Sequence, residues 1–201
     1  MKKLSEKDTL DIVGRSEPLI QLDAELDEDI SKIIKSSRFL VVGGAGSIGS
    51  AVCEEIFKKN PKEIHIIDIN ENALVELVRN LRTKYKSSAL LKTYVIDAGS
   101  KSFNMLLESL PRIDYVLNLS AMKHVRSERD PYTLMRMIYT NVIYPYENLK
   151  LFERFNIPNY FVVSSDKASN PQNLMGASKK MMEICLSNIN TNIKISSSRF
   201  A

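Results

Sequence analysis

Apolar and polar residues alternate along most of this chain in a pattern that switches between two periods. From residue 39 onward, short apolar runs rich in Val and Ile recur, as is typical of strands covered on both faces. They predict strands at 39–43, 64–68, 91–96, 114–119, 159–164 and 193–199. Between these runs, apolar residues at helical spacing predict helices at 48–59, 71–85, 101–110, 132–155 and 173–188. This alternation predicts an α/β fold with a doubly wound parallel sheet and right-handed crossovers.

The N-terminal part differs from the rest of the chain. Residues 1–37 are acidic between Glu17 and Asp29 and contain one short amphipathic pattern, from Leu26 to Ile34. We therefore predict an N-terminal extension over residues 1–37 and a nucleotide-binding domain over 38–201. Within that domain, Pro145 lies inside the predicted helix 132–155 and is expected to kink or interrupt it.

Composition narrows the class of protein. The chain has 201 residues, of which 44% are hydrophobic and 26% charged, which is ordinary for a globular domain. It lacks both an apolar run long enough to span a bilayer and the apolar core of a signal peptide, so we predict a cytoplasmic protein with no membrane span. The net charge of +4 is spread among acidic residues, which predicts no nucleic-acid partner. Cys53 and Cys185 lack metal-ligand spacing, and we predict no metal site.

A glycine cluster follows the first apolar run. Gly43, Gly46 and Gly49 are spaced three apart, after a predicted strand and at the start of a predicted helix. In this setting the first glycine permits a tight turn, the second lets a pyrophosphate approach, and the third lets the helix pack on the strand. The backbone N–H groups around Ser47 and Ile48 then face a phosphate, which predicts dinucleotide binding.

Asp68 ends the second predicted strand, where a dinucleotide places its adenosine ribose. A carboxylate there accepts hydrogen bonds from the ribose hydroxyls and repels a 2′-phosphate, which favours NAD over NADP. Arg79 and Arg82, on the next predicted helix, leave NADP open. The alternative is that Asp68 only ends the strand and caps the helix that starts near Asn70.

Polar and small residues follow the later predicted strands, at the sheet edge where ligands bind in this fold. Asp97 and Ala98 are placed to meet the adenine. Ser120 and Ala121 are small enough to let a cofactor lie close. The run Ser164–Lys167 gathers polar groups at the end of a strand, and burying such groups without a role is unfavourable.

Four motifs together resemble the extended short-chain dehydrogenase/reductase superfamily. More narrowly, they are similar to bacterial UDP-N-acetylhexosamine 4,6-dehydratases of capsule, flagellin-glycan and bacillosamine-type polysaccharide biosynthesis. The motifs are Gly43-Gly-Ala-Gly-Ser-Ile-Gly49, Ser120-Ala-Met-Lys-His-Val125, Ser164-Ser-Asp-Lys-Ala168 and Asn173-Leu-Met-Gly-Ala-Ser-Lys179.

The resemblance implies an internal redox dehydration of a UDP-sugar, most simply UDP-N-acetylglucosamine, with NAD or NADP as cofactor. Hydride leaves C4 of the hexose, water is eliminated across C5 and C6, and the hydride returns to C6. By position, Asp166 is the acid, Lys167 the C5 base, Ser165 the hydrogen-bond partner of the C4 oxygen, and Lys179 the holder of the nicotinamide ribose. Apolar surroundings of Asp166 would favour its protonated form.

One motif residue departs from the superfamily. Met175 stands where the superfamily has a tyrosine, four residues before Lys179, and a thioether cannot deprotonate the C4 hydroxyl. Some capsule-type members share this methionine, so the C4 base is Lys179 or a water, and Met175 is counted with the catalytic positions. The alternative is that Met175 only fills the core.

The resemblance also places Lys123, His124 and Asn141 near the substrate, although Lys123 and His124 fit a solvated loop equally well. The apolar stripe from Tyr132 to Phe155 is either core or the face of a homo-oligomer. The chain ends within the sixth predicted strand, before most of the family's C-terminal substrate domain. Two alternatives therefore stay open: a nucleotide-sugar epimerase or reductase, and a non-catalytic NAD-binding module.

Overall fold

In the computed structural model, residues 11–12, 14, 16, 23–124 and 128–200 are described. Contacts divide the chain into two units, residues 1–33 and 34–201. Helix α2 (Ala24–Ser36) carries acidic residues in its first turn and Lys35 in its last, an arrangement that complements the helix dipole. It covers the amphipathic pattern seen in the sequence, while the domain division at residue 37 stays a prediction.

Within the described residues of the second unit, six strands form one parallel sheet in the order β3-β2-β1-β4-β5-β6. The strands are β1 (Arg38–Val42), β2 (Glu63–Asp68), β3 (Leu90–Val95), β4 (Tyr115–Asn118), β5 (Asn159–Ser165) and β6 (Lys194–Phe200). This is the doubly wound fold that the sequence predicts. The strand order reverses between β1 and β4, and ligands bind at such a switch point in open α/β sheets.

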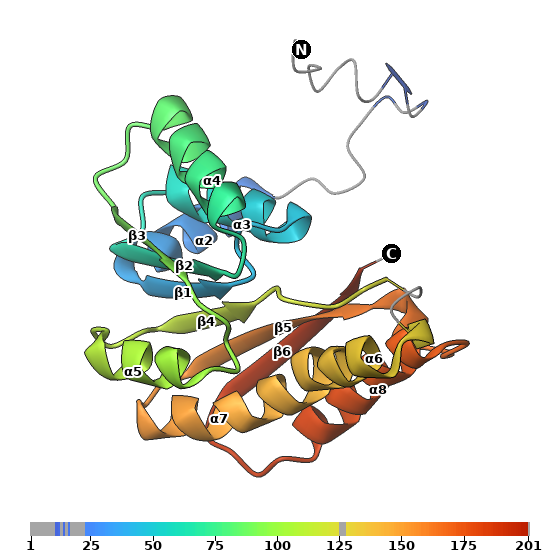
Figure 1. Ribbon diagram of the computed structural model, residues 1–201. Helices are drawn as coiled ribbons and strands as arrows, with labels where there is room; N and C mark the ends of the chain where they lie inside the picture. The colour runs from blue at the N-terminus through green and yellow to red at the C-terminus, as the bar shows by residue number, and fades with distance from the viewer. Residues whose placement is uncertain (1–10, 13, 15, 17–22, 125–127, 201) are drawn as a thin grey trace. The chain divides into compact units, whose positions relative to one another are not determined.

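Helices cover both faces of this sheet. Figure 1 shows α3 and α4 on one face and α5, α7 and α8 on the other, as right-handed crossovers require when the strand order reverses. Their bounds are α3 (Ser47–Lys58), α4 (Glu71–Lys84), α5 (Lys101–Ser109), α6 (Pro131–Ile138), α7 (Tyr144–Arg154) and α8 (Leu174–Ser187).

Aromatic side chains anchor the core between the sheet and the second helix layer. Phe152 of α7 lies against Phe103 of α5 edge to face, with ring centroids 6.4 Å apart, and against Tyr160 of β5 at 5.2 Å. All three side chains are almost fully buried. Their packing holds α5 and α7 against β5 and so sets the position of the carboxyl ends of the strands.

The predicted helix 132–155 is interrupted, as Pro145 led us to expect. A π-helical turn, η2 (Tyr139–Ile143), separates α6 from α7, and the N–H of Tyr144 donates to the carbonyl of Tyr139, five residues back. Proline cannot donate a backbone hydrogen bond, so the regular ladder is lost at this point. The wide turn turns Asn141 into the protein interior, where it is completely buried.

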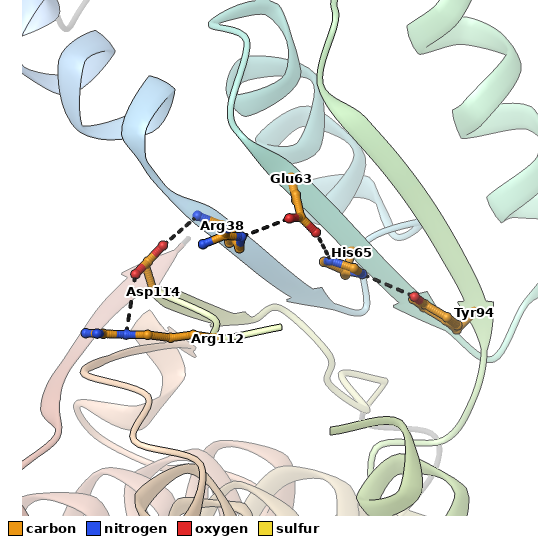
Figure 2. A network of polar contacts seen from close by, with 6 residues as sticks. All are labelled: Arg38, Glu63, His65, Tyr94, Arg112 and Asp114. Atoms are coloured by element: carbon orange, nitrogen blue, oxygen red, sulfur yellow. Dashed lines mark hydrogen bonds and ion pairs between the residues drawn. The ribbon is translucent and has the colours of Figure 1, made fainter. Parts of the chain in front are cut away.

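A polar network joins β1, β2, β3 and the residue before β4 near the amino edge of the sheet (Figure 2). Glu63 accepts from Arg38 Nε at 2.8 Å and lies 3.1 Å from Nε2 of His65, whose Nδ1 is 3.2 Å from the Tyr94 hydroxyl. The Arg38 amide donates to Asp114 at 2.9 Å. His65 is completely buried with both ring nitrogens partnered, so it is a satisfied core histidine.

Candidate active site

A cavity of about 700 Å³ opens where the carboxyl ends of the strands meet. Most residues that the sequence singled out line it together. They are Gly43, Gly46, Ser47, Ile48, Gly49, Asp68, Asp97, Ala98, Ser120, Ala121, Lys123, Ser165, Lys167, Met175 and Lys179. Residues from six separate segments of the chain therefore share one cavity, which is the arrangement that a dinucleotide and a second ligand require.

The glycine loop is shaped by close backbone approach. Gly43 has φ of +73°, and a Cβ added there would lie 2.6 Å from the amide nitrogen of Ser120 at the end of β4. A Cβ at Gly49 would lie 2.1 Å from the carbonyl oxygen of Gly43. At Gly46, by contrast, the nearest atom would be 3.4 Å away, so this position is open toward the cavity. The loop thus leaves room for a ligand at its middle glycine and nowhere else among the three.

Asp68 connects the glycine loop to the end of β2. Its two carboxylate oxygens accept hydrogen bonds from the backbone N–H groups of Ala45 and Asn70, both at 3.0 Å. The cap of α4 is the Asn70 side chain, which accepts from the Ala73 amide at 3.0 Å. The alternative in which Asp68 is the helix cap is therefore wrong. Each oxygen of Asp68 keeps further accepting capacity toward the cavity.

Three cavity residues that the sequence analysis missed come from the interrupted helix. Arg136 forms an ion pair with Asp97, and its guanidinium lies 5.7 Å from the centre of the Tyr144 ring. Thr140 has a buried hydroxyl that is without a hydrogen-bond partner within the described structure. These residues recur every four positions, and that spacing is the only signal in the sequence that could have placed them on one face.

Asn141 does not line the cavity, so the prediction that it binds substrate directly is not supported. Its Oδ1 accepts from the Met122 amide at 2.9 Å, and its Nδ2 donates to the Met122 carbonyl at 2.9 Å and to Ser178 Oγ at 3.0 Å. Because both amide protons are used and the side chain is completely buried, no ligand can reach it. Asn141 instead connects the segment after β4 to α8 through these hydrogen bonds.

The segment after β4 supplies one wall of the cavity. Asn118 accepts from the amide and the hydroxyl of Ser120, at 3.1 and 2.6 Å, and this holds the small residues in place. Lys123 is exposed and faces the cavity, whereas His124 is exposed and does not line it. Val125, the last residue of that motif, lies outside the described residues.

The polar residues at the end of β5 lie at the mouth of the cavity. Ser165 Oγ lies 3.0 Å from Asp166 Oδ1, which also accepts from the Lys167 amide at 2.8 Å. The hydrogen bond from Ser165, with smaller contributions from the amide and charge of Lys167, lowers the pKa of Asp166. The side chain of Asp166 is 54% exposed and does not line the cavity. The expected apolar surroundings are absent at this residue, because the strand end opens to solvent.

Lys179 is almost completely buried beneath this strand end. Its ammonium donates to the Val163 carbonyl at 2.9 Å, and burial lowers its pKa to about 8. Met175 lies one turn earlier in α8 and is also buried against the cavity. Its amide donates to the carboxylate of Glu128 at 2.7 Å, a contact that the sequence did not predict.

Comparison with known proteins places this architecture in a family. The family model described as polysaccharide biosynthesis protein matches residues 39–201. The chain belongs to this family. It is an extended short-chain dehydrogenase/reductase of polysaccharide biosynthesis, which confirms the resemblance to that superfamily drawn from the sequence motifs.

Curated relatives, including the following two, resemble the chain in sequence. An uncharacterized membrane protein of Methanocaldococcus jannaschii is 34% identical over 78% of this chain and 44% of its own length. The probable polysaccharide biosynthesis protein EpsC of Bacillus subtilis is 30% identical over 94% of this chain and 30% of its own length. The chain thus spans less than half the length of these relatives. Among its described residues, no helix is long and apolar enough to cross a bilayer.

A solved structure shares the fold. It is a UDP-glucose 4-epimerase of Stenotrophomonas maltophila with bound NAD and formylated UDP-arabinopyranose, with a TM-score of 0.69 and 19% identity. The match covers 81% of this chain and 52% of the epimerase.

Proposed function

We propose that this chain carries the NAD(P)-binding and catalytic half of a UDP-N-acetylhexosamine 4,6-dehydratase of polysaccharide biosynthesis. The observation that carries the proposal is the single cavity shared by the glycine loop, the end of β5 and the buried lysine of α8. Membership of the polysaccharide biosynthesis family and the similarity to a UDP-sugar enzyme solved with NAD support the same substrate class.

The cavity fits a dinucleotide cofactor. Gly46 leaves the N-terminus of α3 open, and as the N-cap it provides no side chain to occupy the first amides of that helix. The carboxylate of Asp68 would hold the adenosine ribose, which favours NAD, and the unpartnered hydroxyl of Thr140 provides a further polar contact. When bound, the nicotinamide would take up hydride from the sugar and return it.

In this proposal the chain's own residues bind the sugar and move its protons. Lys167, at the mouth of the cavity, would take the C5 proton, and Ser165 would hydrogen-bond the C4 oxygen. Asp166 would protonate the departing C6 hydroxyl. Because its pKa lies below the ordinary value in the open site, a bound sugar must displace water from Asp166 before it can act as an acid.

Lys179 is the candidate for the C4 base, because Met175 cannot accept a proton. A pKa of about 8 leaves a fraction of the buried amine neutral at physiological pH. The neutral amine can accept the C4 hydroxyl proton directly or through one water. The ammonium form would hold the ribose hydroxyls of the cofactor, and it donates to the Val163 carbonyl.

A nucleotide-sugar epimerase is the second candidate, favoured by the lowered pKa of Asp166, because epimerisation at C4 needs no acid at C6. The test is to incubate the complete gene product with UDP-N-acetylglucosamine and NAD+ and to follow the nucleotide sugar by mass spectrometry. A dehydratase yields a 4-keto-6-deoxy product that has lost one water. Conversion to the C4 epimer with no change in mass would refute the dehydratase and support the epimerase. Binding of NAD+ without any binding of the sugar nucleotide would refute both in favour of a cofactor-binding module.

A further inference from the structure

A hydrogen-bonded cluster lies behind the cavity and joins three elements, β5, β6 and α8. The carboxylate of Glu183, in α8, accepts from Ser164 Oγ of β5 at 2.6 Å. It also accepts from Nε and Nη2 of Arg199 in β6, at 2.9 and 2.7 Å. The remaining Arg199 nitrogen, Nη1, donates to Ser169 Oγ at 3.0 Å, directly after the turn that holds Lys167. One ion pair thus contacts both ends of the segment that carries the proposed acid and base.

Lys179 also links α8 to the end of β5. It lies one helical turn before Glu183, and its ammonium donates to the carbonyl of Val163, the residue before Ser164. Two consecutive residues of β5 are therefore held against two consecutive turns of α8. Val163 is held by the ammonium of Lys179, and Ser164 by the carboxylate of Glu183. The side chain of Glu183 is only 15% exposed, so its charge is screened weakly by solvent.

We propose that the Glu183–Arg199 pair is a positioning device that fixes the end of β5 against α8 and balances the charge facing Lys179. The proposal rests on the proposed function, because Lys179 is the group whose protonation it controls. Glu183 touches neither the cavity nor the reacting atoms, and it acts through Ser164 and Lys179.

The charges around Lys179 support this assignment. Burial lowers the pKa of Lys179, and the negative charge of Glu183 opposes that effect. The hydrogen bond from Arg199 lowers the pKa of Glu183, which keeps the carboxylate ionised. Other charged groups line the same cavity: the carboxylates of Asp68 and Asp97, the second paired with Arg136, and the exposed ammonium groups of Lys123 and Lys167. Val163, Ser164 and Thr140 present neutral groups, and among the described residues Glu183 is the charge that acts on the pKa of Lys179.

If the pair balances the charge near Lys179, substitutions in it must shift the pKa of Lys179 in a defined direction. A purely structural role of the pair predicts no such direction. Glu183→Gln keeps an acceptor for Ser164 but removes the negative charge that opposes the effect of burial, so the pKa of Lys179 falls. Arg199→Met leaves the negative charge of Glu183 unpaired, so the pKa of Lys179 rises. We expect opposite shifts of roughly one pH unit, the lower end of the range for a nearby charge.

The experiment is an NMR titration of the lysine side-chain signals of this chain, in which a Lys179→Met variant identifies the Lys179 signal. No substrate or cofactor is added, so the result does not depend on whether the dehydratase assay succeeds. Glu108→Gln is the matched control, because Glu108 forms an exposed ion pair with Arg154 away from the cavity and should leave the titration unchanged.

Arg199→Lys provides a second variant that keeps the charge if Arg199→Met does not fold, and it should retain the wild-type midpoint. Opposite shifts in Glu183→Gln and Arg199→Met, or a retained midpoint in Arg199→Lys beside a lowered one in Glu183→Gln, support the proposal. Shifts in the same direction, or no shift in Glu183→Gln, would overturn it.

Discussion

Replacing Gly46 and Gly49 separately by alanine separates the two roles of the glycine loop. The chemical change is the same, one added methyl group, but the surroundings differ. At Gly49 the new Cβ would lie 2.1 Å from the Gly43 carbonyl oxygen and 2.8 Å from the Gly44 Cα. At Gly46 it would meet only the Gly43 oxygen, at an ordinary contact distance of 3.4 Å.

The expected effects on stability follow from these distances. At Gly49 the obstructing atoms are backbone, so the loop and α3 must move apart by more than 1 Å. We assign this the upper end of the range for overpacking, about 3 kcal/mol. That corresponds to a fall in Tm of about 6–12 °C for a domain of this size. At Gly46 the backbone has ordinary N-cap angles, and exchanging glycine for alanine there costs about 0.5–1 kcal/mol.

The stabilisation that NAD+ provides should be sensitive to Gly46→Ala, although this substitution costs the fold little. With NAD+ at about 100 times its Kd, the wild-type chain gains about 2.7 kcal/mol, a rise in Tm of about 5–10 °C. In Gly46→Ala the methyl group occupies the space expected for the diphosphate, so this rise should vanish although the fold is kept. The assay is thermal unfolding of each variant with and without NAD+. An unchanged NAD+-induced rise in Gly46→Ala would refute the placement of the diphosphate at this loop.

Three further substitutions test other parts of the molecule. Burial lowers the pKa of His65 below its ordinary value of about 6.5, so the unfolded chain binds more protons at acidic pH and stability is lost as the pH falls below that value. His65→Gln should flatten the acidic slope of the unfolding free energy, and an unchanged slope in urea titrations at several pH values would contradict this. Asn141→Ala leaves buried polar groups unpaired and should cost about 3 kcal/mol, read from the urea midpoint, whereas a loss under about 1 kcal/mol would show that these hydrogen bonds are dispensable. Lys179→Met should retain the fold, because it removes a buried charge, but it should abolish turnover by the gene product. Activity above a tenth of wild type would exclude Lys179 as the C4 base.

The sequence predicted the parts of the site that the backbone alone demands. Gly49 is required by a steric contact with Gly43 within one βαβ unit, Gly43 makes the tight turn of that unit with a φ of +73°, and Asp68 ends a strand of it, so short-range spacing was sufficient. The contact between Arg136 and Asp97 joins residues 39 positions apart, across a crossover, and no local pattern indicates such a partner. The buried position of Asn141 depends on a π-helical turn, which the helical period cannot reveal.

Protonation states are the property of this site that sequence reasoning handled least well, and the reason is physical. Asp166 and Lys179 lie 13 positions apart and belong to one proposed reaction, yet their surroundings shift their charges in ways that no motif records. Asp166 lies at an open strand end among hydrogen-bond donors, which stabilise its ionised form. Lys179 lies beneath the same strand, where burial favours its neutral form. In the open site the acid is therefore ionised and the lysine is close to releasing its proton. If the proposed dehydration is correct, substrate binding must change the surroundings of Asp166 far more than those of Lys179. Turnover is then lost as the pH rises through the pKa of Asp166, and this limb should lie at higher pH for kcat, which reports the substrate complex, than for kcat/KM, which reports the free enzyme.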